Sequence, residues 1–230
     1  MVTLTNRLLM VAGMVRDGRP LADIGTDHAY LPVYLLQNGT IPSAAACDVR
    51  EGPLRNAAAT VEREGFSDRV ELLLCSGYDH PALTEYHDFV MAGMGGNLIA
   101  DLMEAAPFLQ APDHHFVLQP QSHAEDVRAF LYAHGFTILR ETAVEDGGRI
   151  YIALEAEYTG DIRDCTLSDC YLGELPKSSS PYRFDYFRRV LHRLTARCDA
   201  LRSYSEEQEE CRMLEDVIRS VETVLKEEEL

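Results

Sequence analysis

Acidic side chains stand at two places in the first fifty residues where they could hold a positively charged ligand. Asp23 and Asp27 enclose Ile-Gly-Thr after a short apolar stretch, and Asp48 closes a second apolar stretch. If both stretches are parallel strands, the three carboxylates meet at the carboxyl edge of the sheet, where doubly wound folds bind their ligands. An acid at the end of the second strand typically accepts hydrogen bonds from ribose hydroxyls.

The loop after the first strand differs from the loop that binds dinucleotides. The dinucleotide loop has the pattern Gly-x-Gly-x-x-Gly and seats a pyrophosphate on helix amides, whereas Asp27, His28 and Tyr30 stand at the matching places here. Two carboxylates would repel a pyrophosphate but suit a phosphate-free ligand with a cationic end. S-adenosylmethionine has a ribose, an amino group and a sulfonium, so we expect it as the cofactor. The alternative is a structural loop with solvated acids.

Two later blocks add to the same predicted edge. Glycines 93, 95 and 96 follow a fourth apolar run and let the backbone approach a ligand closely, with helix amides available behind them. Gln119-Pro120 ends the next run and supplies an amide side chain and a rigid turn. A flexible strand–helix turn would rarely need three glycines, so we interpret the block as part of a ligand site.

The elements that position these residues alternate between strands and helices. Strands are predicted at 21–24, 43–49, 70–75, 88–91 and 116–118, and helices at 4–15, 32–37, 53–64, 97–105 and 124–134. Two β-rich runs at 136–144 and 149–157 enclose a Gly-containing turn and predict a hairpin. The order predicts an α/β fold with a Rossmann-like, class I methyltransferase sheet that ends in an antiparallel hairpin.

The pattern changes after residue 158. Residues 159–181 are rich in Gly, Pro and Ser, and apolar residues then recur every three or four positions in two runs, at 184–201 and 211–225. Ser205-Glu-Glu-Gln208 between the runs fits a capping box, so we expect an antiparallel helical hairpin with a coiled-coil seam. The predicted units are a cofactor-binding domain at 1–158, a linker at 159–181 and a helical domain at 182–230.

Charge is divided unevenly between the two predicted C-terminal helices. The chain has a formal charge of −17, which excludes whole-surface attraction to a polyanion, so any nucleic-acid contact needs a local basic patch. Residues 183–202 hold six arginines against two aspartates, while 206–230 hold ten acids against three bases. The helices either pair electrostatically with each other or present the arginine face to phosphates. The candidate RNA-binding residues are Arg183, Arg188, Arg189, Arg193 and Arg197.

Composition also bears on location and on the cysteines. No apolar run approaches the roughly 18 residues that span a bilayer, and Arg7 interrupts the apolar N-terminal stretch, which therefore does not resemble a signal peptide. We expect a cytoplasmic protein with no membrane contact and no obligate protein partner. The six cysteines contain no Cys-x-x-Cys pair, which predicts free structural thiols and no metal site.

Five blocks together resemble the bacterial tRNA (adenine-N1)-methyltransferase family known as TrmK. They are Asp-Ile-Gly-Thr-Asp-His-Ala-Tyr-Leu-Pro at 23–32, Glu-Gly-Pro at 51–53, Ala-Gly-Met-Gly-Gly at 92–96, Leu-Gln-Pro at 118–120 and Gly-Arg-Ile-Tyr at 148–151. The resemblance covers nearly the whole chain, since that family also ends in a helical coiled-coil domain. It implies that S-adenosylmethionine is the cofactor and that N1 of adenine 22 in tRNA is methylated.

The resemblance also implies places for the cofactor-binding residues. Asp23, Gly25 and Asp27 would border the methionine part, Asp48 and Val49 would hold the ribose and adenine, and Gly93 with Met94 would line the methyl-transfer side. Gly77 and Ala92 complete the expected set. The chain departs from the family pattern at Ser76, where an acid is common, and at Gln121, where Asn is common.

The chemistry at N1 of adenine suggests the catalytic roles. N1 carries a neutral lone pair, so no strong base is needed, but methylation leaves a cationic ring that a nearby carboxylate would stabilise. We expect Asp27 in that role, with Tyr30 stacking on or orienting the base and His28 nearby, although His28 could equally be a satisfied loop histidine. The remaining alternatives are a methyltransferase for a small molecule or protein, and a non-enzymatic Rossmann-like module.

Overall fold

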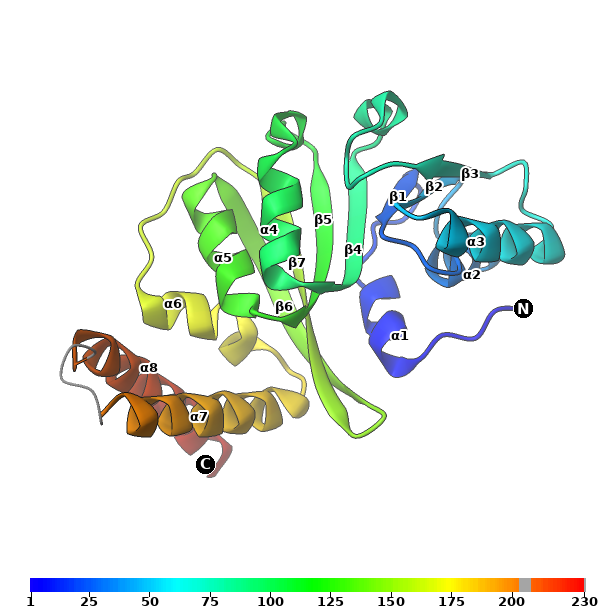
Figure 1. The fold of residues 1–230 in the computed structure, drawn as a ribbon. Coiled ribbons are helices and arrows are strands. Elements are labelled where there is room, and N and C mark those ends of the chain that lie inside the picture. The colour runs from blue at the N-terminus through cyan, green and yellow to red at the C-terminus, as the bar shows by residue number, and fades with distance from the viewer. Residues whose placement is uncertain (203–207, 230) are drawn as a thin grey trace.

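The computed structural model describes residues 1–202 and 208–229 (Figure 1). Among them, seven strands form one sheet in the order β3-β2-β1-β4-β5-β7-β6. The first five strands are parallel, and β7 runs antiparallel to both β5 and β6. This arrangement confirms the predicted fold class, including the terminal hairpin.

The strands form where short apolar runs end at glycine or polar residues. Their bounds are β1 (Leu21–Ile24), β2 (Ala44–Asp48), β3 (Val70–Leu74), β4 (Asp88–Gly95), β5 (His115–Ser122), β6 (Phe136–Asp146) and β7 (Arg149–Tyr158). β4 and β5 extend beyond their apolar runs, because Met94 and Gly95 continue to pair with Pro120 and Ser122 across irregular register. The glycine block and the Gln-Pro block therefore lie on neighbouring strands.

Helices cover both faces of the sheet, and the side chains of each strand alternate between two cores. In β2, Ala45 and Cys47 join one buried cluster, whereas Ala44 and Ala46 join the other. The first five α-helices are α1 (Asn6–Ala12), α2 (Tyr30–Gln37), α3 (Glu51–Glu64), α4 (Gly96–Glu104) and α5 (Ala124–Ala133), with short 3₁₀ helices η1 (Pro81–Glu85) and η2 (Pro107–Leu109). The sequence predicts these α-helices, but not the 3₁₀ turns.

Two long helices, α7 (Tyr182–Leu201) and α8 (Gln208–Lys226), lie alongside each other below the sheet in Figure 1, and η5 (Glu227–Glu229) follows α8. They are antiparallel, since Arg197 pairs with Glu210 and Arg188 with Glu228. Val190, Val217 and Val224 are also buried in the seam, in addition to the positions that the spacing predicts. The predicted capping box at 205–208 falls mostly outside the described residues. No helix in the described ranges is long and apolar enough to cross a membrane.

The prediction of six free thiols is wrong for two of them. Cys198 of α7 and Cys211 of α8 form a disulfide across the seam, with their Cα atoms 5.2 Å apart. The other four cysteines are free. Spacing along the chain could not reveal this pair, because only the register of the helical hairpin places the two residues opposite each other.

A buried ion pair attaches the segment after residue 158 to the sheet. Arg128 of α5 donates from Nε and Nη2 to the Glu141 carboxylate of β6 at 2.9 and 2.6 Å, and both side chains are fully buried. Arg128 Nη1 also donates to the carbonyls of Cys170 and Tyr171 at 2.9 Å. These carbonyls end α6 (Leu167–Leu172), which is followed by η3 (Leu175–Lys177). Helix α6 thus lies within the segment 159–181 that the sequence predicts as a linker. The predicted division of the chain into domains stays a prediction.

Glycine is required where this segment crosses the ion pair. A Cβ on Gly173 would lie 2.2 Å from Glu141 Oε1 and 2.3 Å from Arg128 Nε, and the residue has a φ of +56°. The backbone therefore passes directly against the two charges, and the amide of Glu174 donates to Glu141 Oε1 at 3.1 Å. The close passage supplies the carboxylate with a further hydrogen bond.

We predict that Glu141→Gln destabilises the chain by about 3–5 kcal/mol, because it leaves the Arg128 charge buried without its counter-ion. Urea denaturation followed by circular dichroism measures the loss. The matched control is Arg219→Ala, which breaks an exposed pair with Asp216 on α8 and should cost less than about 1 kcal/mol. Equal losses for the two variants would contradict a structural role for the buried pair.

Candidate active site

Two cavities adjoin each other at the carboxyl ends of β1, β2 and β4. The larger, of about 360 Å³, is lined by Asp48, Val49, Gly77 and neighbouring residues. The smaller, of about 190 Å³, is lined by residues of α1 and of the turn after β1. Gly25 and Ala92 line both cavities, so the two form adjoining compartments. This shape suits an elongated ligand with chemically different ends.

The structure brings together every residue that the sequence predicts for cofactor binding. Asp23 and Asp27 line the smaller cavity, as do the predicted catalytic residues His28 and Tyr30. The larger cavity or both cavities receive the remaining seven: Gly25, Asp48, Val49, Gly77, Ala92, Gly93 and Met94. They meet because β2, β1 and β4 are neighbours in the sheet. Their individual roles stay predictions.

The turn after β1 needs a glycine. Gly25 has a φ of +81°, and a Cβ there would lie 2.0 Å from Cε of Met94. The amides of Gly25 and Thr26 both donate to the carbonyl of Cys47 at 2.8 Å, which holds the turn against the end of β2. Met94 can therefore cross the junction of the two cavities only because position 25 lacks a side chain.

Asp23 is the most perturbed acid at this edge. Its side chain is 7% exposed, and among the residues that the structure describes no basic side chain forms an ion pair with it. Burial raises the pKa of Asp23 to about 6, although a hydrogen bond with Thr26 opposes the shift. A cation entering the smaller cavity would therefore find a desolvated carboxylate that lacks a counter-ion.

Asp48 lines the larger cavity, and a backbone hydrogen bond orients its side chain. Its side chain is almost fully buried, and Oδ1 accepts a hydrogen bond from the backbone amide of Arg50 at 2.8 Å. This bond fixes the orientation of the carboxylate at the end of β2. The side chain is thereby held at the cavity wall, in the position expected for an acceptor of ribose hydroxyl groups.

A strained turn presents the predicted catalytic residues. Ala29 has a φ of +52°, an unfavourable conformation for a residue with a Cβ, and its amide donates to Thr26 Oγ1 at 3.1 Å. The rings of His28 and Tyr30 stack at 4.9 Å with an interplanar angle of 8°. Asp27 is largely exposed, with Oδ2 3.5 Å from Nε2 of His28. The turn thus offers a flat aromatic surface and a carboxylate side by side.

Sequence reasoning missed Arg7 as a site residue. This side chain of α1 lines the smaller cavity together with Asp23 and Asp27. Its Nη1 donates to Oε1 of Gln119 at 2.7 Å, and its guanidinium lies 5.8 Å from the centroid of the Tyr151 ring. In the sequence, Arg7 is noticeable only as a charged residue within an otherwise apolar helical stretch. This pattern does not reveal which part of the sheet α1 packs against.

The candidate RNA-binding arginines of α7 separate into two groups. Arg188 pairs with Asp185 and Glu228, and Arg197 pairs with Glu210. Arg183 donates to the carbonyl of Ser180 and lies over the Phe184 ring.

Arg189 and Arg193 instead line a third cavity, between the sheet and α7. Charge pairing with acids, the structural alternative for this helix, thus describes Arg188 and Arg197, and it also describes Arg193, which pairs with Glu125 of α5 at 3.2 Å. It does not describe Arg189.

Comparison with known proteins agrees with this geometry. Residues 4–154 match a family model described as a methyltransferase domain. The tRNA (adenine(22)-N(1))-methyltransferase of Bacillus subtilis is 34% identical over 154 residues, which are 67% of this chain and 65% of that protein. A putative tRNA methyltransferase of Mycoplasma pneumoniae is 34% identical over 161 residues, covering 66% of this chain and 71% of that protein. The chain belongs to the TrmK family of methyltransferases.

Solved TrmK structures share the architecture over nearly the whole chain. The crystal structure of B. subtilis TrmK superposes with a TM-score of 0.87 at 26% identity, covering 98% of this chain and 100% of that one. A putative tRNA (m1A22) methyltransferase of Streptococcus pneumoniae, solved in complex with S-adenosyl-L-methionine, has a TM-score of 0.81 at 32% identity and the same coverage. These matches confirm the family resemblance and include the C-terminal helices.

We predict that S-adenosylmethionine binds about tenfold more weakly at pH 5 than at pH 7. With a pKa of about 6, Asp23 of the free protein is mostly ionised at pH 7 and mostly protonated at pH 5, and only the ionised form attracts a cation. Isothermal titration calorimetry at each pH gives the affinities. Asp23→Asn should bind weakly at both pH values, and a wild-type affinity independent of pH would contradict the role of Asp23.

Proposed function

We propose that this chain transfers the methyl group of S-adenosylmethionine to N1 of an adenine in tRNA, at position 22. The observation that carries the proposal is the buried Asp23 carboxylate, which lacks a basic partner in the described chain and lines a cavity that adjoins the cavity of Asp48. The names of the B. subtilis and S. pneumoniae relatives support the same reaction and cofactor. We expect the chain to act where tRNA is found, in the cytoplasm.

The residues of the two cavities fit the parts of this cofactor. Asp48 and Val49 of the larger cavity would hold the ribose and adenine. In the smaller cavity, Asp23 would pair with the ammonium group and Arg7 with the carboxylate of the methionine part. Gly25 and Ala92, which line both, would border the sulfonium. When bound, the cofactor supplies an electrophilic methyl group whose transfer leaves the adenine ring positively charged.

The residues of the strained turn would act on the target base. Asp27 is exposed beside the smaller cavity and would stabilise the positive charge that develops on the ring. The stacked rings of His28 and Tyr30 would support the extruded base and align N1 with the methyl group. No strong base is needed, since N1 is already an unprotonated lone pair.

Methylation of a small molecule or a protein is the alternative reaction. The third cavity favours tRNA over these substrates because it contains arginines, and among the described residues no carboxylate pairs with Arg189. Labelled S-adenosylmethionine, incubated with the chain and unmodified tRNA, would label the nucleic acid. Nucleoside analysis would then reveal 1-methyladenosine.

We predict that Asp27→Ala lowers kcat by about a hundredfold or more, the usual effect of removing one electrostatic stabiliser of a transition state. Initial rates of methyl transfer to tRNA measure the loss, while calorimetry should still detect binding of S-adenosylmethionine. Asp68→Ala, which removes an exposed acid outside the three cavities, is the control. A near-normal rate for Asp27→Ala would remove this residue from the mechanism.

A further inference from the structure

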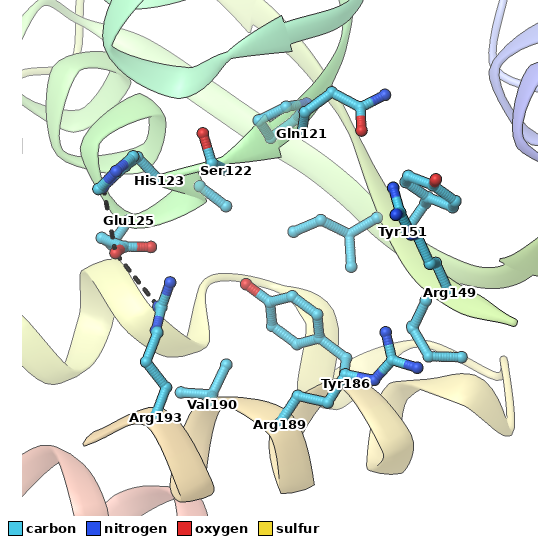
Figure 2. Close-up of a pocket in the computed structure, with 14 residues that line it drawn as sticks. Gln121, Ser122, His123, Glu125, Arg149, Tyr151, Tyr186, Arg189, Val190 and Arg193 are labelled. Carbon is cyan, nitrogen blue, oxygen red and sulfur yellow. Dashed lines mark hydrogen bonds and ion pairs between the residues drawn. The ribbon is translucent and has the colours of Figure 1, made fainter. Parts of the chain in front are cut away.

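A cavity of about 370 Å³ lies between the end of β5, the start of β7 and α7 (Figure 2). We infer that this cavity binds the nucleotide adjacent to the target adenosine, with Arg149 and Arg189 on its phosphate and Tyr151 against its base. The inference rests on the proposed function and adds to it a second RNA subsite outside the methyl-transfer site. Its volume lies within the range of about 300–1,000 Å³ that is usual for small-ligand sites.

Three segments that are distant in the sequence build the walls. Gln121, Ser122 and His123 come from the end of β5 and the turn before α5, as Figure 2 shows. β7 contributes Arg149 and Tyr151, and α7 contributes Tyr186, Arg189 and Arg193, with the Tyr186 ring directed from α7 into the cavity. The combination of arginines with tyrosines is typical of sites that bind phosphate and stack bases.

The charge of this cavity is positive although the chain is strongly acidic. Arg189 Nη2 donates to the carbonyl of Gly148 at 3.1 Å, which orients the guanidinium, and no acid in the part of the chain that the structure describes pairs with it. The Arg149 side chain is exposed and forms no hydrogen bond or ion pair with any residue in the described ranges. Arg193 is paired with Glu125 at 3.2 Å. Two unneutralised guanidinium groups therefore line the cavity, and guanidinium binds phosphate through paired hydrogen bonds.

The cavity lies next to the methyl-transfer site. Arg7 separates the two, because it lines the smaller cofactor cavity and lies against the ring of Tyr151, which lines this one. A chain of RNA that presents one base to Asp27 and Tyr30 can therefore place a neighbouring nucleotide against Tyr151.

Base extrusion supplies the physical reason for a second subsite. N1 lies on the Watson–Crick edge, so the target base must leave its stack, which exposes one face of the neighbouring base. The Tyr151 ring would cover that face and replace the lost stacking partner, while Arg149 and Arg189 hold the phosphate between the two nucleotides. The cavity would thereby lower the cost of extrusion and align the target base.

The charge contribution is tested by removing the two arginines together. Arg149→Ala with Arg189→Ala should raise the Kd for tRNA about tenfold and lower the slope of log Kd against log salt by about 1 to 2. The affinity for S-adenosylmethionine should not change. The control, Arg202→Ala with Arg219→Ala, removes the same charge from exposed pairs on the helical hairpin and should leave both values unchanged. Equal effects in the two double variants would overturn the inference.

The stacking contribution is tested with a modified substrate. An abasic nucleotide on one side of the target adenosine should lower kcat/KM for the wild type about tenfold. Tyr151→Leu should show the same loss with normal tRNA and no further loss with the abasic one, whereas Tyr151→Phe should behave as wild type. The inference would be overturned if Tyr151→Leu and the abasic nucleotide lowered kcat/KM independently, so that their losses multiplied, whichever neighbour of the target adenosine was abasic. A wild-type chain that methylates no tRNA would instead overturn the proposed function itself.

Discussion

The buried pair between Arg128 and Glu141 determines how the C-terminal part of the chain sits on the sheet. Moving both charges out of water costs several kcal/mol, and good geometry with additional hydrogen bonds is needed to offset that cost. Here the guanidinium bonds the carboxylate twice and two carbonyls of α6 once each. Because α6 precedes α7, this pair also positions α7 opposite the end of β5. The third cavity depends on that placement.

Asp23 shows the opposite use of a buried charge. Its carboxylate has no counter-ion within the described chain, and burial raises its pKa from the usual 3.8 to about 6. Above pH 6 the folded state therefore holds an ionised buried acid, which lowers the stability of folding by about 3 kcal/mol at neutral pH. A bound ammonium group would offset this loss. The fold thus satisfies one buried charge internally and leaves another for a ligand.

The cofactor site was predictable because it depends on strand ends, and strand ends follow from local patterns. The β1 bounds agree with the predicted 21–24, and the parallel order β2-β1-β4 brings the acids and glycines to one edge. Arg7 and the Cys198–Cys211 disulfide depend instead on how separate helices pack. Residues 167–172 form a helix inside a turn-rich segment, where a capping box between Thr166 and Asp169 begins it and the distant Arg128 binds carbonyls in its last turn. Such long-range contacts leave no periodic signal in the sequence.

The arginines of α7 show why composition alone left two interpretations open. Arg188 and Arg197 face the acids of η5 and α8, while Arg189 and Arg193, four residues apart and hence on one helical face, line the cavity. Pairing with α8 neutralises much of the positive charge of α7 in a chain whose formal charge is −17. Long-range attraction of RNA is therefore weak, and binding must depend on the few guanidinium groups that remain unpaired. An RNA that lacks the matching shape at this cavity gains little from charge, so the same pairing that stabilises the hairpin also favours selectivity.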